Sequence, residues 1–229
     1  MTEVPAVAPG ASGIELRRDV ILMGASAGGI DAIGKVLAAL PKDLKAAIGV
    51  TLHRSPTHAS VLTEILGARS QLEVVQAENG QRFEPGRVYL APPDYHLMFN
   101  GGFVVLDHGP RVNHARPSVN VMFSSGARNF GTRVIGVILT GNLNDGVAGL
   151  TSIKHHGGLS LAQEPAEALA PSMPLNAVAY DGVDIIFRVA SGAEVLTKLV
   201  GSKGVSAALE TRGARRPKDA SSASGVGYE

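Results

Sequence analysis

The chain of 229 residues has a formal net charge of +1, with 45% hydrophobic and 18% charged residues, which is typical of a soluble globular protein with one main core. The small net charge and the few aromatic residues (four Tyr, six Phe, no Trp) argue against nucleic acid as a partner. Cysteine is absent, which excludes disulfides, zinc–thiolate sites and a cysteine nucleophile. No apolar run approaches the roughly 18 residues of a membrane span, so we expect no membrane insertion and a cytoplasmic location.

Both ends of the chain are expected to be flexible tails, because residues 1–18 and 203–229 are rich in small and polar residues without periodicity. One domain is predicted between them, at residues 19–202. It begins with a short apolar run at 19–24, a glycine-rich turn, and apolar residues at helical spacing up to Pro41. An apolar strand at 46–53 and a helical pattern at 58–68 then repeat this strand–turn–helix unit.

The middle of the domain holds short β-rich runs separated by Gly and Pro. They predict added strands or a β-hairpin arm at one edge, and they are "LEVVQA", "RVYLAP", "HLMFN" and "FVVLD". The pattern after them predicts, in order, a helix at 118–130, a strong strand at 132–141, a helix at 145–157, a strand at 159–164, a short helix at 171–179, a strand at 183–187 and a helix at 191–200 capped by Ser191. This alternation predicts the α/β class: a doubly wound, mostly parallel sheet with helices on both faces.

Three polar residues follow the three strongest predicted strands. Ser26 follows the first strand, His53 closes the second, and Asp145 lies in the loop "TGNLND" after the strand at 132–141. Parallel sheets place their ligand sites at the carboxyl ends of the strands, so we expect the three side chains to converge. Nucleophilic catalysis needs a hydroxyl that attacks, an imidazole that takes its proton and a carboxylate that orients the imidazole.

The serine lies in the pattern G-x-S-x-G, from Gly24 to Gly28, between a strand and a helix. The backbone N–H of Ala27, at the start of this helix, is a candidate oxyanion donor. Each residue also has a simpler interpretation: the serine as part of a turn or of an anion-binding loop, His53 as a hydrogen-bonded strand-end residue, and Asp145 as the N-cap of the helix that follows it. Neither common phosphate-loop motif is present.

The remaining histidines do not form a metal-binding pattern such as H-E-x-x-H, so we expect no metal and no cofactor. They are His58, His96, His108, His114, His155 and His156.

Six segments, in this order, resemble CheB-type protein-glutamate methylesterases over about residues 19–200. They are "GASAGG", "LHRSP", "GRVYLAPPDYHL", "RPSVNVMFSSGA", "VILTGNLNDGVAGL" and "AQEPAEALAPSMP". The resemblance implies hydrolysis of glutamate γ-methyl esters on chemoreceptors or related signalling proteins, and in some members deamidation of glutamine. It also implies Ser26 as nucleophile, His53 as general base and Asp145 as the orienting carboxylate.

The family typically carries an N-terminal receiver domain, and we expect this chain to be the catalytic domain without it. Ala27 stands where the family usually has threonine, and Asn142 and Leu143 stand where it commonly has methionine and glycine. The backbone N–H of Asn142 remains the expected second oxyanion donor, whereas Leu143 is expected to disturb the loop if that position needs a conformation reserved for glycine.

The interpretations of Arg116 and of the whole chain stay open at this point. Arg116 either meets an acidic receptor surface or is a structural arginine paired with a carboxylate or a carbonyl. A non-catalytic interaction module in a signalling pathway is the alternative to an esterase, and an anion binder at residues 26–29 is a third hypothesis.

Overall fold

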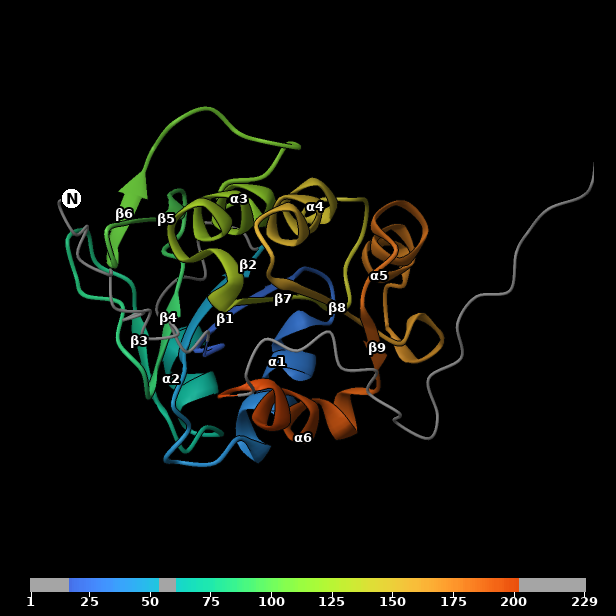
Figure 1. The fold of residues 1–229 in the computed structure, drawn as a ribbon, viewed down its shortest axis with the longest axis horizontal. Coiled ribbons are helices and arrows are strands. Elements are labelled where there is room, and N and C mark those ends of the chain that lie inside the picture. Colours follow the sequence, from blue (N-terminus) through green and yellow to red (C-terminus); the bar gives the residue numbers. More distant parts are fainter. Residues whose placement is uncertain (1–16, 54–60, 202–229) are drawn as a thin grey trace, which may run out of the picture.

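A parallel sheet forms the centre of the computed structural model, which describes residues 17–53 and 61–201 (Figure 1). In this described part the sheet has seven strands in the order β3-β4-β2-β1-β7-β8-β9. Every pair of neighbours is parallel. The strands are β1 (Val20–Ala25), β2 (Ala47–Leu52), β3 (Glu73–Gln76), β4 (Arg87–Leu90), β7 (Val134–Ile138), β8 (Leu159–Gln163) and β9 (Ile185–Phe187).

The three central strands, β2, β1 and β7, are buried along their whole length. Their near-continuous apolar sequences suit strands that are covered on both faces. Successive residues of β1 enter opposite cores: Ile21 and Met23 pack in one hydrophobic cluster, and Val20 and Leu22 pack in the other. The predicted doubly wound parallel sheet is therefore confirmed.

Helices cover the two faces of the sheet. The helices are α1 (Gly29–Ala39), α2 (Val61–Gly67), α3 (Val119–Phe130), α4 (Val147–His155), α5 (Ser172–Asn176) and α6 (Val189–Leu199). Two 3₁₀ helices, η2 (Gly131–Arg133) after α3 and η3 (Pro165–Glu167) before α5, and a π-helix, η4 (Ala177–Asp181) after α5, complete the described part. Helices α1 and α6 lie on one face of the sheet, and α3 and α4 lie side by side on the other (Figure 1).

The β-rich middle of the chain divides between two structures. Strands β3 and β4 extend the main sheet, whereas β5 (His96–Asn100) and β6 (Phe103–Asp107) form a separate antiparallel hairpin. The hairpin is held to α3 by Ser125, whose Oγ accepts a hydrogen bond of 2.7 Å from the backbone N–H of Phe99. The predicted hairpin arm is confirmed, and it is made of the third and fourth β-rich runs.

The last helix begins earlier than the sequence pattern predicts. Helix α6 starts at Val189, so Ser191 lies inside its first turn and donates to the carbonyl of Arg188 instead of capping the helix. The Glu167 carboxylate accepts the backbone N–H of Val189 at 2.6 Å and thereby satisfies one donor of the helix start. A partner distant in sequence replaces the predicted local cap.

Several expectations fall on residues outside the described part. Residues 1–16 of the first proposed tail, the whole of the second, at 203–229, and His58 lie there, whereas Arg17 and Arg18 of the first tail are described. Within residues 17–53 and 61–201, none of the helices has the length and apolar character needed to cross a bilayer.

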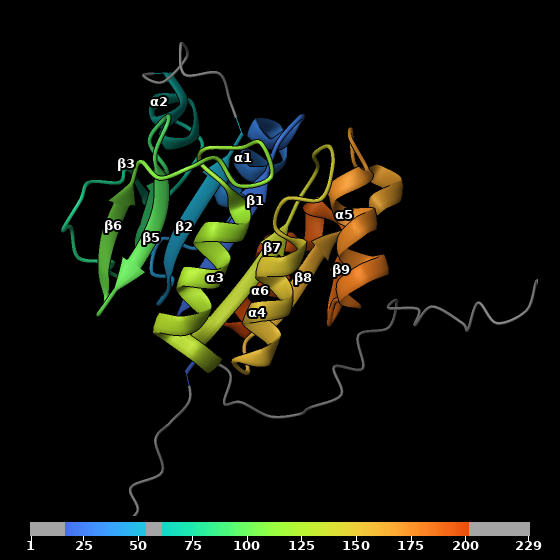
Figure 2. The ribbon, with the colours of Figure 1, turned by 90° about the horizontal axis from the view of Figure 1, so that it is seen from above.

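The chain order creates a crevice beside β1. From β1 the chain moves outward through β2 to β4 and β3, and it later returns to place β7 on the other side of β1. The loops that follow β1 and β7 therefore lead to opposite faces of the sheet and leave a crevice between them. Doubly wound sheets bind their ligands in such a crevice. Figure 2 shows the strands of the main sheet between the helices, and their parallel pairing puts the carboxyl ends of β1, β2 and β7 at one edge.

Helices α3 and α4 approach closely at Gly149, so we expect a larger residue at this position to destabilise the fold. A Cβ added at Gly149 of α4 would lie 2.5 Å from the Phe123 Cβ and 3.2 Å from the backbone of Asn120, both in α3. We expect Gly149→Ala to lower the free energy of unfolding by about 1–3 kcal/mol, measured by urea denaturation.

Gly67→Ala is the matched control for this prediction. The nearest atom to a Cβ at Gly67 is 3.9 Å away, so the helix gains an alanine without a clash. We expect this variant to change the free energy of unfolding by at most about 1 kcal/mol, in the stabilising direction. Equal losses in both variants would contradict the packing argument.

Candidate active site

Ser26 lies directly after β1, at the turn into α1. Its backbone N–H donates to the carbonyl of Thr140 at 2.9 Å, which ties the turn to the end of β7, and its side chain is half-buried. The left-handed residue of the turn is Gly28, with φ of 79°, whereas Ser26 is not among the described residues with positive φ. The turn therefore differs from a strained elbow, because a glycine provides the unusual backbone conformation.

His53 lies directly after β2 and is fixed from two directions. Its backbone N–H donates to the carbonyl of Ala25 at 3.1 Å, which extends the pairing of β1 with β2 by one residue. Its Nε2 lies 2.7 Å from Oδ2 of Asp145. Because Nε2 is engaged by the carboxylate, Nδ1 is the ring nitrogen left to face a substrate or a hydroxyl.

Asp145 is a buried carboxylate, 2% exposed, with four donors around it. Besides His53, it accepts hydrogen bonds from Ser118 Oγ at 2.8 Å, from Val119 N–H at 2.7 Å and from Asn120 N–H at 3.1 Å. These last three donors form the start of α3, so Asp145 caps a helix far from it in sequence. Its predicted alternative role as the cap of the following helix is wrong, because the N-cap of α4 is Gly146.

Burial and hydrogen bonding act on Asp145 in opposite directions. Burial raises the pKa of this carboxyl, but the hydrogen bond with His53 and the backbone N–H groups of Val119 and Asn120 outweigh it, so that the pKa lies below its ordinary value. The carboxyl is therefore ionised at neutral pH. An ionised acceptor on Nε2 keeps the proton of a neutral His53 on that nitrogen and leaves Nδ1 free to accept one.

The three predicted residues meet at one crevice. Ser26, His53 and Asp145 line a cavity of about 390 Å³, and Ser26 and His53 also line an adjoining cavity of about 330 Å³. Among the described residues, Ser26 Oγ and the imidazole of His53 form no hydrogen bond with each other. The structure therefore joins the histidine to the aspartate and places the serine in the same crevice, with its hydroxyl unengaged by the base.

The backbone N–H groups of Ala27 and Asn142 donate to no other residue of the described part. Asn142 is exposed and lines the crevice with Ser26. The next residue, Leu143, has φ of 67°, so this position does require a left-handed backbone, and the leucine adopts it. Asn176 fixes the loop by donating from Nδ2 to the carbonyl of Leu143 at 2.8 Å. The left-handed backbone at this position is the condition under which the sequence leads us to expect that Leu143 disturbs the loop, and that effect stays a prediction. The conformation carries a steric penalty of roughly 1–2 kcal/mol.

Comparison with known proteins assigns the chain to a family. The family model described as CheB methylesterase matches residues 21–196. The chain belongs to the CheB methylesterase family.

Individual relatives of the CheB family support the assignment. A "Protein-glutamate methylesterase/protein-glutamine glutaminase 2" from Methanosarcina mazei is 35% identical over 191 residues, which cover 80% of this chain and 52% of the relative. A protein-glutamate methylesterase/protein-glutamine glutaminase from Yersinia pestis is 41% identical over 174 residues, 74% of this chain and 50% of the relative. The chain thus spans about half the length of these two relatives.

A solved CheB structure has the same fold. The crystal structure of the Thermotoga maritima CheB methylesterase catalytic domain superposes with a TM-score of 0.77 at 31% identity, covering 80% of this chain and 98% of that domain.

Arg116, a candidate for substrate contact from the sequence, is used inside the fold. Its Nε and Nη2 donate to Asp94 Oδ1 at 3.0 and 2.7 Å, and its Nη1 donates to the carbonyls of His108 and Gly109. These contacts support the interpretation as a structural arginine. Arg111 and His114, which are exposed and line the crevice, are the groups that the sequence did not single out.

Ser118 and His96 are the other site residues that sequence reasoning missed. Ser118 is fully buried and donates to Asp145, and its own N–H donates to Nδ1 of the buried His96 at 3.1 Å. The Nε2 of His96 lies 3.0 Å from the carbonyl of Pro110. The available signal was a serine at the first position of the helix predicted at 118–130, but its acceptor lies 27 residues away.

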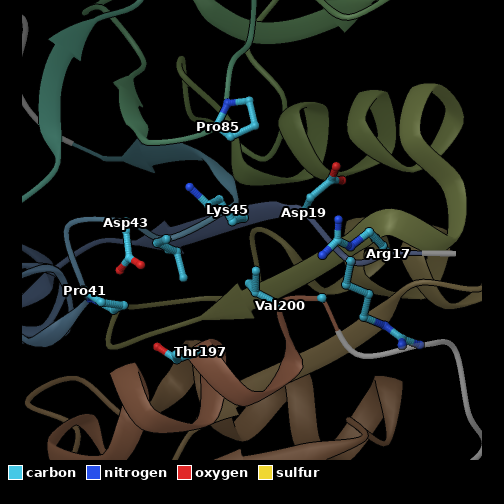
Figure 3. Close-up of a pocket in the computed structure, with 11 residues that line it drawn as sticks. Arg17, Asp19, Pro41, Asp43, Lys45, Pro85, Thr197 and Val200 are labelled. Atoms are coloured by element: carbon cyan, nitrogen blue, oxygen red, sulfur yellow. The ribbon is translucent and has the colours of Figure 1, made fainter. Parts of the chain in front are cut away.

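A larger cavity, of about 510 Å³, opens at the opposite end of the sheet (Figure 3). Asp19 and Lys45, which precede β1 and β2, line it together with Thr197 of α6 and Val200, which directly follows that helix. Neither serine nor histidine is among its lining residues. Its size exceeds that of the crevice, but it lacks the serine and histidine that the predicted chemistry needs.

The environment of Asp145 predicts how stability depends on pH. Because its pKa is lowered by folding, its ionised form contributes stability above the ordinary carboxyl pKa of about 3.9, and the contribution is lost as the pH falls through the folded value. We expect Asp145→Asn to lower the free energy of unfolding by about 2 kcal/mol at pH 7, because the new amide turns a donor toward N–H and O–H donors.

The decisive readout is the difference in the free energy of unfolding between the wild type and Asp145→Asn, measured by urea denaturation at pH 7, 5 and 3. The difference should narrow between pH 5 and pH 3, because pH 3 lies below the ordinary carboxyl pKa of about 3.9 and the stability contributed by the ionised Asp145 declines below that value. Asp43→Asn, at an exposed acid outside the crevice, should stay within about 0.5 kcal/mol of the wild type at pH 7. A difference for Asp145→Asn that stays constant with pH would contradict the role given to its ionisation.

Proposed function

We propose that this chain is a protein-glutamate methylesterase that hydrolyses glutamate γ-methyl esters with Ser26 as nucleophile. The observation that carries the proposal is the His53–Asp145 pair, joined at 2.7 Å, in one crevice with Ser26 at the ends of three adjacent strands. Membership of the CheB family supports the same chemistry.

Acylation begins with the hydroxyl of Ser26. His53 accepts the proton of Ser26 Oγ through Nδ1 while the oxygen attacks the ester carbonyl carbon, and the ionised Asp145 stabilises the imidazolium that forms. The tetrahedral intermediate collapses when His53 returns the proton to the methoxy group, which leaves as methanol. An ester between Ser26 and the glutamate side chain remains.

Deacylation uses the same groups on water. His53 takes a proton from a water molecule that attacks the acyl carbon, and it then protonates Ser26 Oγ as this leaves. The products are the glutamate carboxylate and the free enzyme. In both steps the N–H groups of Ala27 and Asn142 are the donors proposed for the oxyanion, each worth roughly 3 kcal/mol in the transition state.

The proposed partner is a methylated chemoreceptor or a related signalling protein, and the proposed location is the cytoplasm. The relatives from Methanosarcina and Yersinia are named as both methylesterases and glutaminases, so hydrolysis of glutamine is a second reaction to test at the same site. A loop that buries Ser26 or turns the N–H of Asn142 away would favour the non-catalytic alternative, whereas Ser26 lines two cavities and Asn142 lines one of them with it. We therefore favour the enzyme.

Methanol release from a methylated receptor fragment tests the proposal. Ser26→Ala and His53→Ala should each reduce kcat/KM by about 1,000-fold or more, because the nucleophile and its base act as a unit. His155→Ala, at an exposed position on α4, is the matched control and should retain wild-type activity. A folded Ser26→Ala variant that still releases methanol at the wild-type rate would refute the assignment.

A further inference from the structure

Leu143 combines two unfavourable features at one position. Its backbone is left-handed, with φ of 67°, and its side chain is 66% exposed to solvent. A branched side chain gains nothing locally from this conformation, and an exposed leucine gains no burial energy. Such strain is found mainly at functional sites, where the surrounding structure holds it in place.

The surroundings of Leu143 do hold it, and they hold it at the catalytic crevice. Asn176 fixes the carbonyl of Leu143 at 2.8 Å, and two residues later the chain is anchored by the buried Asp145. Leu143 lines the cavity that Ser26 and His53 also line. An apolar group thus lines the same cavity as His53, the base proposed to protonate the leaving group.

We propose that Leu143 makes the site selective for a methyl ester over a primary amide, an inference that rests on the proposed function. The methoxy group of an ester presents a methyl, which gains from contact with leucine. The NH₂ group of glutamine presents two donors, for which the leucine side chain offers no acceptor. The carbonyl of the same residue is already engaged by Asn176.

A comparison of the two substrates isolates the contact between Leu143 and the leaving group, because both substrates form the same acyl-enzyme and share its hydrolysis. A glutamate methyl ester and a glutamine at the same position give the same acyl group on Ser26, so they differ only in the group that leaves. The ratio of kcat/KM for ester and amide therefore reports the contact with the leaving group and is independent of deacylation.

The experiment compares the wild type with Leu143→Asn and Leu143→Met. Asparagine tolerates a left-handed backbone and supplies an acceptor, whereas methionine keeps the apolar character. The substrates are two forms of one receptor fragment, with either a glutamate γ-methyl ester or a glutamine at one position, and the readouts are methanol and ammonia. We expect Leu143→Asn to lower the ester-to-amide ratio by about fivefold or more, and Leu143→Met to keep it within about twofold.

The outcomes separate this inference from the function on which it rests. A wild type that releases methanol, with an ester-to-amide ratio that is the same in Leu143→Asn, Leu143→Met and the wild type, overturns the role of Leu143 and leaves the esterase intact. Equal loss of the ratio in both variants also overturns it, because the effect would then follow from any change at the position. A folded wild type that releases neither product overturns the proposed function itself, and the selectivity with it.

Discussion

The buried carboxylate of Asp145 is the interaction on which the rest of the site depends. A carboxylate that is 2% exposed is costly unless donors surround it, and here the start of α3 supplies three of them. One of its oxygens also holds His53. The same contacts therefore stabilise a helix, keep the carboxyl ionised and orient the base, so that a single group links packing to the proposed chemistry.

The order of the strands brings these groups together. Strands β2, β1 and β7 are adjacent, although they are far apart in the chain, and Ser26, His53 and the loop that ends in Asp145 follow their carboxyl ends. The crossing of α3 and α4 on one face places the start of α3 beside that loop, with Gly149 allowing the close approach. The apolar sequences of the strands thus position polar residues that lie outside them.

The sequence was enough to predict the sheet, the helices and the three residues at the strand ends, because periodicity and strand order are local or rule-based properties. It was not enough for partners distant in sequence. The capping of α3 by Asp145, the contribution of Ser118 and the start of α6 at Val189 each depend on a hydrogen bond across more than 20 residues. From the sequence alone, Arg116 is equally compatible with a substrate contact and with a structural role. Its hydrogen bond to Asp94, seen only in the structure, favours the structural role. Likewise, leucine disfavours a left-handed backbone, so the conformation of Leu143 is set by the surrounding loop and could not be predicted from the residue type.

The most direct test of the central claim is covalent labelling with a fluorophosphonate, which reacts with serine nucleophiles that a base activates. The account predicts one adduct, located by mass spectrometry on Ser26, that forms at least about 100-fold more slowly in folded His53→Ala. It further predicts slower labelling in Asp145→Asn, since the base loses the carboxylate that orients it. An adduct on another residue, or labelling of Ser26 at the same rate without His53, would contradict the claim that Ser26, His53 and Asp145 act as one unit.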